Sequence, residues 1–147
     1  MSGIRIAAGL LVLTALTGAC AAPDQSTGVP VTTAPPAETL TPLLQQALPN
    51  AQGKTFTSSI VDFPPGARAT PHRHGEAFVY AYVLEGTVRS RLNDQPTSTY
   101  HQGQNWVEQP GAHHVLTENA STTDRARLLV VFVSNTGDAL KVDDPHP

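Results

Sequence analysis

Two histidines, His72 and His74, stand two residues apart in the sequence. Successive side chains of an extended chain point to opposite sides, so residues two apart project from the same face. Such a pair can present two imidazole nitrogens to one metal ion, and zinc, iron, copper and nickel all accept imidazole. The spacing therefore predicts part of a metal site on an extended segment.

A third nitrogen ligand has to come from another part of the chain. His113 and His114 follow Pro110-Gly111, a turn-forming pair, at the start of a predicted strand. Neighbours on a strand face opposite ways, so only one of these two histidines can join the site.

Two spaced motifs around these histidines resemble the two motifs of the cupin superfamily, the first over residues 66–86 and the second over residues 103–119. The second motif departs from the family pattern at two positions, because Gln109 replaces a Pro and Glu118 replaces an Asn. Neither change affects a metal ligand. The resemblance covers about residues 54–133 and is that of a compact, single-domain bacterial cupin.

The resemblance implies an all-β fold, the cupin-type double-stranded β-helix or jelly-roll barrel. It also implies a divalent transition metal, which is iron, manganese, zinc, nickel or copper. His72 and His74 match the histidines of the first motif, and His114 matches the histidine of the second. The fourth ligand of the family is a Glu, which would fall on Phe78 or Val79, so that Glu is missing here.

Two nearby acidic residues could replace the missing Glu. Glu76 lies two residues after His74 and would share its face if the strand continued, and Glu108 precedes the turn of the second motif. We consider Glu76 first and Glu108 second, with solvent or substrate completing a three-histidine site otherwise. Three protein ligands with open positions are typical of a catalytic metal.

Aromatic residues near the motifs, Phe78, Tyr80 and Trp106, are expected in the barrel core or lining its pocket. We expect a small-molecule ligand or substrate there. One hypothesis is an oxygenase or isomerase acting on a small organic acid or phenol, and the alternative is a non-catalytic module that binds a sugar or another small ligand. The resemblance also implies a homodimer.

Short strands must position these residues. The chain has 147 residues, with 13 Pro, 11 Gly and only 14% charged residues, which favours strands and turns over long helices. One short helix is predicted over residues 41–48, because Thr41 can cap it and Pro42 suits its first position. Strands are predicted over residues 55–63, 77–84, 87–92, 97–101, 105–108, 114–118 and 126–134.

The length predicts one domain, residues 40–137, followed by a tail over residues 138–147 that should fray. Residues 1–19 have the layout of a secretory signal, and their uncharged run is shorter than the roughly 20 residues that span a bilayer. Cys20 lies in a lipobox-like stretch and is the predicted lipid attachment site, with ordinary cleavage after Ala21 as the alternative. Residues 20–39, rich in Ala, Pro and Thr, are a predicted disordered tether.

These features predict an exported protein, either a membrane-anchored lipoprotein or a periplasmic or extracellular one. The net charge is −3 and the chain has no basic stretch, so nucleic acid is not an expected partner. A single Cys excludes an intramolecular disulfide and a Cys-rich zinc site.

Overall fold

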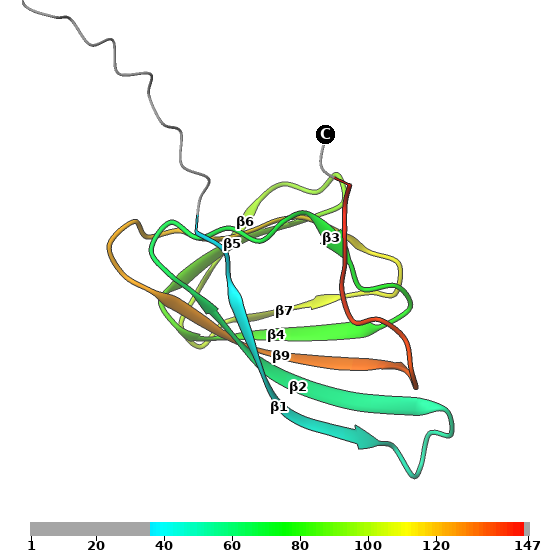
Figure 1. Ribbon diagram of the computed structural model, residues 1–147. Helices are drawn as coiled ribbons and strands as arrows, with labels where there is room; N and C mark the ends of the chain where they lie inside the picture. The colour runs from blue at the N-terminus through cyan, green and yellow to red at the C-terminus, as the bar shows by residue number, and fades with distance from the viewer. Residues whose placement is uncertain (1–35, 146–147) are drawn as a thin grey trace, which may run out of the picture. The chain divides into compact units, whose positions relative to one another are not determined.

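The computed structural model describes residues 36–145, all within one compact unit, Thr33–Pro147. Two antiparallel sheets of five strands each make up this unit (Figure 1). The first sheet has the order β1 (Thr39–Ala47), β2 (Lys54–Phe63), β9 (Ala126–Asn135), β4 (Phe78–Glu85) and β7 (Asn105–Glu108). The second has the order β10 (Val142–Asp143), β3 (His72–Arg73), β8 (His113–Asn119), β5 (Thr87–Leu92) and β6 (Ser98–His101).

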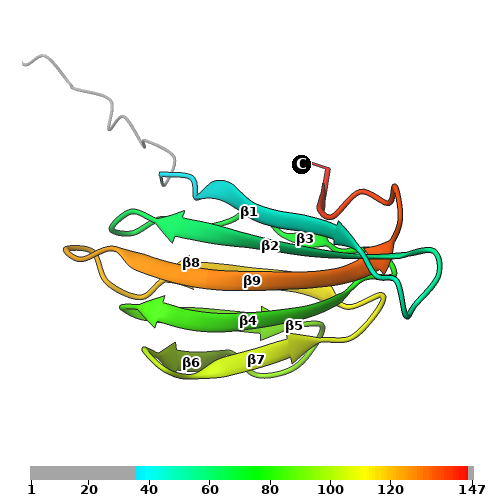
Figure 2. The same ribbon diagram turned by 90° about the horizontal axis from the view of Figure 1, so that it is seen from below.

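The core lies between the two sheets. Figure 2 shows the first sheet in front, with strands of the second sheet behind it. Along β9 buried and half-buried residues alternate strictly, as expected of a strand with one covered face. The largest fully buried apolar side chains are Phe63, Val79, Val83 and Val88. Each buried side chain of this size contributes about 1.5–3 kcal/mol to folding.

The all-β prediction is confirmed. All seven predicted strands are present as β2 and β4–β9, and each end lies within one residue of its predicted position. The positions of these strands can be predicted because strands with one buried face alternate apolar and polar residues, and because turn residues separate them.

The predicted helix over residues 41–48 is wrong, because this segment belongs to strand β1. β1 pairs with β2 from Thr39, opposite Asp62, to Ala47, opposite Thr55. The helix signals come from neighbouring residues in the sequence, and such local preferences are weak. Hydrogen bonding to strand β2 outweighs them. Every residue of β1 is exposed, so no alternation of buried residues marks it as a strand.

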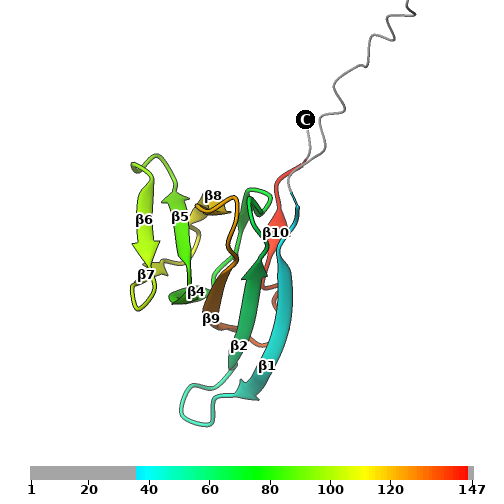
Figure 3. The ribbon, with the colours of Figure 1, turned by 90° about the vertical axis from the view of Figure 1, so that its left-hand side faces the viewer.

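Both ends of the described chain belong to the fold. β10, drawn in red in Figure 3, pairs with β3 within the segment predicted as a fraying tail. Glu38, which lies in the predicted tether, accepts a hydrogen bond from Lys141 Nζ at 2.8 Å. The folded part therefore begins before residue 40 and continues beyond residue 137.

The remaining N-terminal predictions lie outside the described residues. They are the secretory signal, the lipid attachment at Cys20 and the tether up to residue 35. Within residues 36–145 there is no helix of the length and apolar character that crossing a membrane requires.

A tight connection at Gly86 takes the chain from the first sheet to the second. Gly86 has a φ of +77°, which L side chains rarely adopt. A Cβ at this position would lie 2.6 Å from the carbonyl oxygen of Arg125. Only glycine fits here, and the turn thus brings β4 and β5 into opposite sheets.

Candidate metal centre

Three histidines meet where β3 and β8 pair. His72 lies directly opposite His114 in the register of these strands, with ring centroids 5.1 Å apart. His74 follows β3, and its ring centroid is 4.7 Å from that of His72. Each of the three offers a ring nitrogen, and these nitrogens lie within 4.8 Å of one another. His113 faces away from the cluster and contacts Asp144 at 2.7 Å, as alternation along a strand requires.

Backbone carbonyls fix the orientation of the first two rings. His72 Nδ1 donates to the carbonyl oxygen of Thr70 at 2.7 Å, and His74 Nδ1 donates to that of Leu140. A neutral imidazole with its hydrogen on Nδ1 has a lone pair on Nε2. The two Nε2 atoms lie 3.1 Å apart, so two lone pairs face each other. A cation bound by both nitrogens would convert this repulsion into attraction.

The rings of His72 and His74 are neutral near pH 7. Burial lowers the pKa of His72 to about 4, and the neighbouring His74 and His114 add to this effect, whereas the bond to Thr70 opposes it. Burial also lowers the pKa of His74. Metal ions bind neutral imidazole, so both side chains are ready to act as ligands without losing a proton.

A buried carboxylate, that of Glu108, completes the cluster. Its Oε1 accepts a hydrogen bond from Trp106 Nε1 at 3.1 Å and lies 3.1 Å from His114 Nδ1. Its Oε2 lies 3.6 Å from His74 Nε2 and has no hydrogen-bond partner among the described residues. Burial acts to raise the pKa of Glu108, but the nearby His114 and His74 and the hydrogen bond from Trp106 outweigh burial and lower it.

This donor set fits a divalent transition metal. The side chain of Glu108 is only 3% exposed, and an ionised carboxylate in such a place is costly unless a positive charge compensates it. The neutral rings of His72 and His74 do not supply that charge. Imidazole nitrogens together with a carboxylate oxygen are ligands that zinc, iron, manganese, nickel and copper accept.

Hydroxyl groups hold the third ring. His114 Nε2 lies 2.8 Å from Ser90 Oγ and 2.6 Å from Thr117 Oγ1, and its Nδ1 has no hydrogen-bond partner among the described residues. Buried polar atoms normally have a hydrogen-bond partner or bind an ion or water. The two buried atoms of this cluster without a hydrogen-bond partner within residues 36–145, His114 Nδ1 and Glu108 Oε2, are therefore candidate metal ligands.

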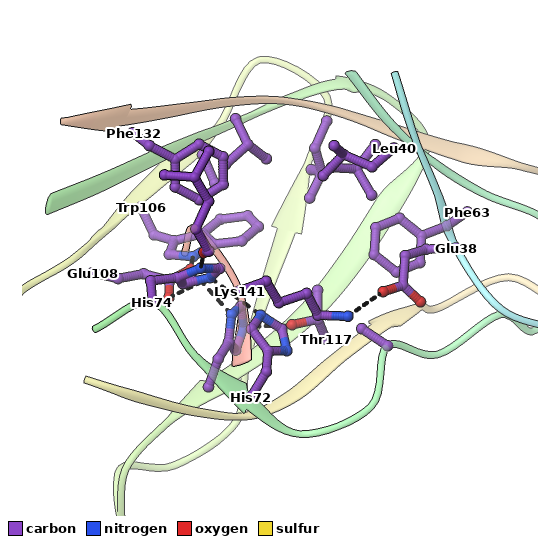
Figure 4. Close-up of a pocket in the computed structure, with 17 residues that line it drawn as sticks. Glu38, Leu40, Phe63, His72, His74, Trp106, Glu108, Thr117, Phe132 and Lys141 are labelled. Atoms are coloured by element: carbon purple, nitrogen blue, oxygen red, sulfur yellow. Dashed lines mark hydrogen bonds and ion pairs between the residues drawn. The ribbon is translucent and has the colours of Figure 1, made fainter. Parts of the chain in front are cut away.

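The cluster lies at one end of a cavity of about 290 Å³ (Figure 4). Away from the cluster, most of the cavity wall is apolar. The exception is the ion pair of Glu38 and Lys141, which Figure 4 also shows. The larger apolar side chains of the wall are Leu40, Val61, Phe63, Trp106, Leu128, Val130, Phe132 and Leu140.

Glu76, the first alternative for the fourth ligand, lies away from the histidines. It is exposed and sits in the turn between β3 and β4. Gly75, just before it, has a φ of +57°. The extended conformation therefore ends there, and the alternation that would align Glu76 with His74 does not continue. Glu108 is the acidic residue that the structure brings to the cluster.

The structure places one of the three predicted aromatic residues on the cavity wall. Trp106 lines the cavity, whereas Phe78 and Tyr80 do not. On β4 the inward positions belong to Val79 and Ala81, which are each 1% exposed. Phe78 and Tyr80 alternate with these two residues and face the other side of the sheet.

Sequence reasoning missed the contribution of the C-terminal segment. Leu140 and Lys141 line the cavity, and the carbonyl of Leu140 orients His74. β10 is only two residues long, too short to show a period in the sequence. No sequence signal marks this segment as part of the site.

Comparison with known proteins is consistent with the fold. The family described as "Cupin domain" matches residues 59–132. A search of curated proteins finds no match.

Solved structures with similar folds include three of different kinds. An uncharacterised protein with a double-stranded β-helix domain from Klebsiella pneumoniae has a TM-score of 0.58 at 13% identity, covering 75% of this chain and 86% of its own. The cupin domain of Schizosaccharomyces pombe Cnp3 has a TM-score of 0.56 at 17% identity, covering 67% and 62%. Recombinant oxalate oxidase in complex with glycolate has a TM-score of 0.52 at 23% identity, covering 60% and 45%. The match spans less than two thirds of the Cnp3 cupin domain and of oxalate oxidase. At these sequence identities the similarity is one of fold.

Proposed function

Because this chain belongs to the cupin domain family, we propose that it binds a divalent transition metal and takes a small molecule into the adjoining cavity. The ligands are His72, His74 and His114. The observation that carries this proposal is the 3.1 Å approach of two imidazole nitrogens, His72 Nε2 and His74 Nε2. The unpaired carboxylate oxygen of Glu108 lies beside them.

Glu108 is the proposed fourth ligand, through Oε2. Its other oxygen is engaged with Trp106 at 3.1 Å, which orients the carboxylate and leaves Oε2 toward His74. Partners of this kind around a metal site typically change metal affinity by 10–100-fold.

The finer proposal is a small-molecule oxygenase or isomerase. A metal bound here would supply a Lewis acid or, if redox-active, oxygen chemistry. The chain itself would orient the ligands through the carbonyls of Thr70 and Leu140 and exclude water with apolar walls. A fold relative, oxalate oxidase, is known in complex with glycolate, which supports a small molecule as the occupant.

A second candidate is a non-catalytic binding module, and one observation favours it. Apart from the four candidate ligands, the ionisable residues lining the cavity within the described part of the chain are Glu38 and Lys141. These two form an ion pair with each other at 2.8 Å. Among residues 36–145, no further acid or base of the cavity wall is therefore free to move a proton on a bound molecule.

Reconstitution tests the metal proposal. Protein stripped with a chelator is titrated separately with iron(II), manganese, zinc, nickel and copper, and the unfolding temperature is followed. A ligand that binds only the folded state raises this temperature. We expect at least one metal to raise the unfolding temperature of the parent protein. The rise should be lost in His74→Ala and kept in His101→Ala, which removes an exposed histidine. An equal response of both variants would overturn the proposal.

Turnover separates the two candidates. The loaded protein is incubated with small organic acids and phenols, and oxygen uptake and products are measured. Conversion of any of these organic acids or phenols supports an oxygenase or isomerase. Thermal shifts with specific ligands but without conversion support the binding module.

We also propose that the chain is exported and carries a lipid at Cys20, which only the sequence supports. Incorporation of labelled palmitate into cells expressing the full chain tests this proposal, with Cys20→Ser as the matched control. Label in the parent alone is expected, and equal absence from both would contradict it. A homodimer stays a prediction that sedimentation of the protein checks.

A further inference from the structure

The lining of the cavity points to the class of molecule that this site takes. We infer an amphiphile with one anionic oxygen head group and an apolar body, such as a monocarboxylate with a hydrocarbon chain. This inference rests on the proposed function, because the head group has to meet the metal ion.

The head group follows from the charges at the cluster. A metal ion binds imidazole that carries no extra proton and carboxylate that has lost its proton. A divalent ion held by the three clustered histidines and the unpaired oxygen of Glu108 therefore leaves a net charge of +1. The cluster is buried, and His72, His114 and Glu108 are each at most 5% exposed. A buried net charge is unfavourable unless it is paired. One anionic oxygen group would neutralise it.

The body follows from the walls. The cavity of about 290 Å³ has the space of about ten water molecules. Most of its lining consists of aliphatic and aromatic side chains such as Leu128, Val130 and Phe132. Each methylene group that moves from water into such surroundings strengthens binding by about fourfold. A hydrocarbon chain therefore suits this space better than a polar one.

A second polar group on the ligand would have no free partner among the described residues of the wall. Lys141 is the cation there, and its Nζ already contacts Glu38 at 2.8 Å and Asp143 at 3.0 Å. A dicarboxylate or a sugar would have to displace these carboxylates or lie unpaired against side chains such as Phe63. Both alternatives are unfavourable.

Calorimetric titration of the zinc-loaded protein tests the inference. Zinc is redox-inactive, so binding is measured without oxygen chemistry. The probes are the linear carboxylates from acetate to octanoate, the matching primary alcohols, succinate and glucose. Trp106, the single tryptophan, lines the cavity, so its fluorescence shows whether a probe binds there.

We expect the dissociation constant of the carboxylates to fall by about fourfold per methylene until the cavity is filled. Succinate and glucose should bind at least tenfold more weakly than hexanoate. The preference for carboxylate over alcohol should vanish when zinc is removed, because the head group then has no ion to meet.

A variant tests where the chain-length limit lies, which is the longest carboxylate for which an added methylene group still strengthens binding. Ala81 is 1% exposed and lines the cavity, so Ala81→Leu should fill part of it and make the limit shorter. Val107→Ala removes an exposed side chain elsewhere and should leave the limit unchanged. The series on the parent protein stands by itself if Ala81→Leu fails to fold.

Two outcomes overturn the account, and they are distinguishable. Zinc that binds, together with a flat chain-length series or tighter binding of succinate or glucose, overturns this inference and leaves the metal site intact. Failure to bind zinc or any of the other metals overturns the proposed function, and with it the head-group part of the inference.

Discussion

Glu108 lies directly opposite Val79 in the antiparallel pair of β4 and β7. Val79 is one of the two positions on which the cupin motif would place its glutamate ligand. Both residues are buried, at 3% and 1% exposure. Residues paired across two strands share one face of the sheet. A carboxylate therefore stands one strand away from the position at which the family motif carries it.

Replacing Glu108 should weaken metal binding. In Glu108→Gln the side chain keeps its size but loses its charge, so we expect an affinity at least 10–100-fold lower in competition with a chromophoric chelator, which is the loss typical of residues that only support a ligand. Glu76→Gln is the control, because Glu76 is exposed and outside the cluster, and its affinity should equal that of the parent. Equal losses in both variants would contradict a direct role for Glu108.

Moving the carboxylate from position 108 to position 79 tests whether the two paired positions serve the same metal site. Glu108→Val removes the charge, and adding Val79→Glu returns one to the opposite position on the same face. The double variant should bind metal more tightly than Glu108→Val alone. If it binds no better, the two positions do not serve the same site.

The metal-free protein should lose stability in mild acid. The pKa of His72 falls from 6.5 to about 4 on folding, so between these values the unfolded chain binds more protons than the folded one. Stability therefore falls as the pH drops through this window. From pH 6.5 to pH 5 His72 contributes a loss of about 2 kcal/mol.

Urea unfolding at several pH values measures this slope. His74, whose pKa is also lowered, acts in the same direction, and Glu108 adds to the loss below pH 4.5. His72→Gln removes one titrating group, so its slope should be shallower than that of the parent. Identical slopes would show that His72 is not held neutral in the folded protein.

The sequence predicts this fold well wherever a strand has one buried face. β9 and β4 alternate along their length, and their bounds agree with prediction to within one residue. β1 has no such pattern, since its residues are all exposed, and residues 41–48 carry helix signals instead. What decides its conformation is the edge of β2, which local sequence does not reveal.

The site could be predicted only in part for a similar reason. Spacing along one strand correctly brings His72 and His74 together, and the second motif supplies His114. Glu76 is misplaced by the same argument, because the chain turns at Gly75. Glu108 comes from β7, so its place in the cluster depends on strand pairing, and spacing along the sequence does not contain that information.

Removing the C-terminal segment should weaken the site. Deletion of residues 138–147 takes away the Leu140 carbonyl that holds His74 Nδ1, and the part of the cavity wall at Lys141. We expect lower metal affinity and stronger quenching of Trp106 fluorescence by acrylamide. Deletion of residues 146–147 alone is the control and should change neither. Unchanged quenching in the longer deletion would show that the segment does not cover the cavity.

The turn at Gly86 should tolerate no side chain. Gly53 and Gly86 both have a φ of +77°, but only at Gly86 would a Cβ contact the backbone, at 2.6 Å from Arg125. Gly53→Ala should cost about 1–2 kcal/mol of unfolding free energy from the backbone conformation. Gly86→Ala should cost about 1–3 kcal/mol more, because the chain must shift. Equal costs in chemical denaturation would contradict the close approach.

The metal content of the purified protein tests the central claim most directly. Residues 33–147, the compact unit that includes Glu38, are purified without chelator or affinity tag and analysed for elements, beside a His72→Ala/His114→Ala variant prepared in the same way. We predict about one equivalent of a single transition metal in the parent and none in the variant. A parent that is empty and cannot be loaded with iron, manganese, zinc, nickel or copper would contradict the account, as would equal metal contents in parent and variant.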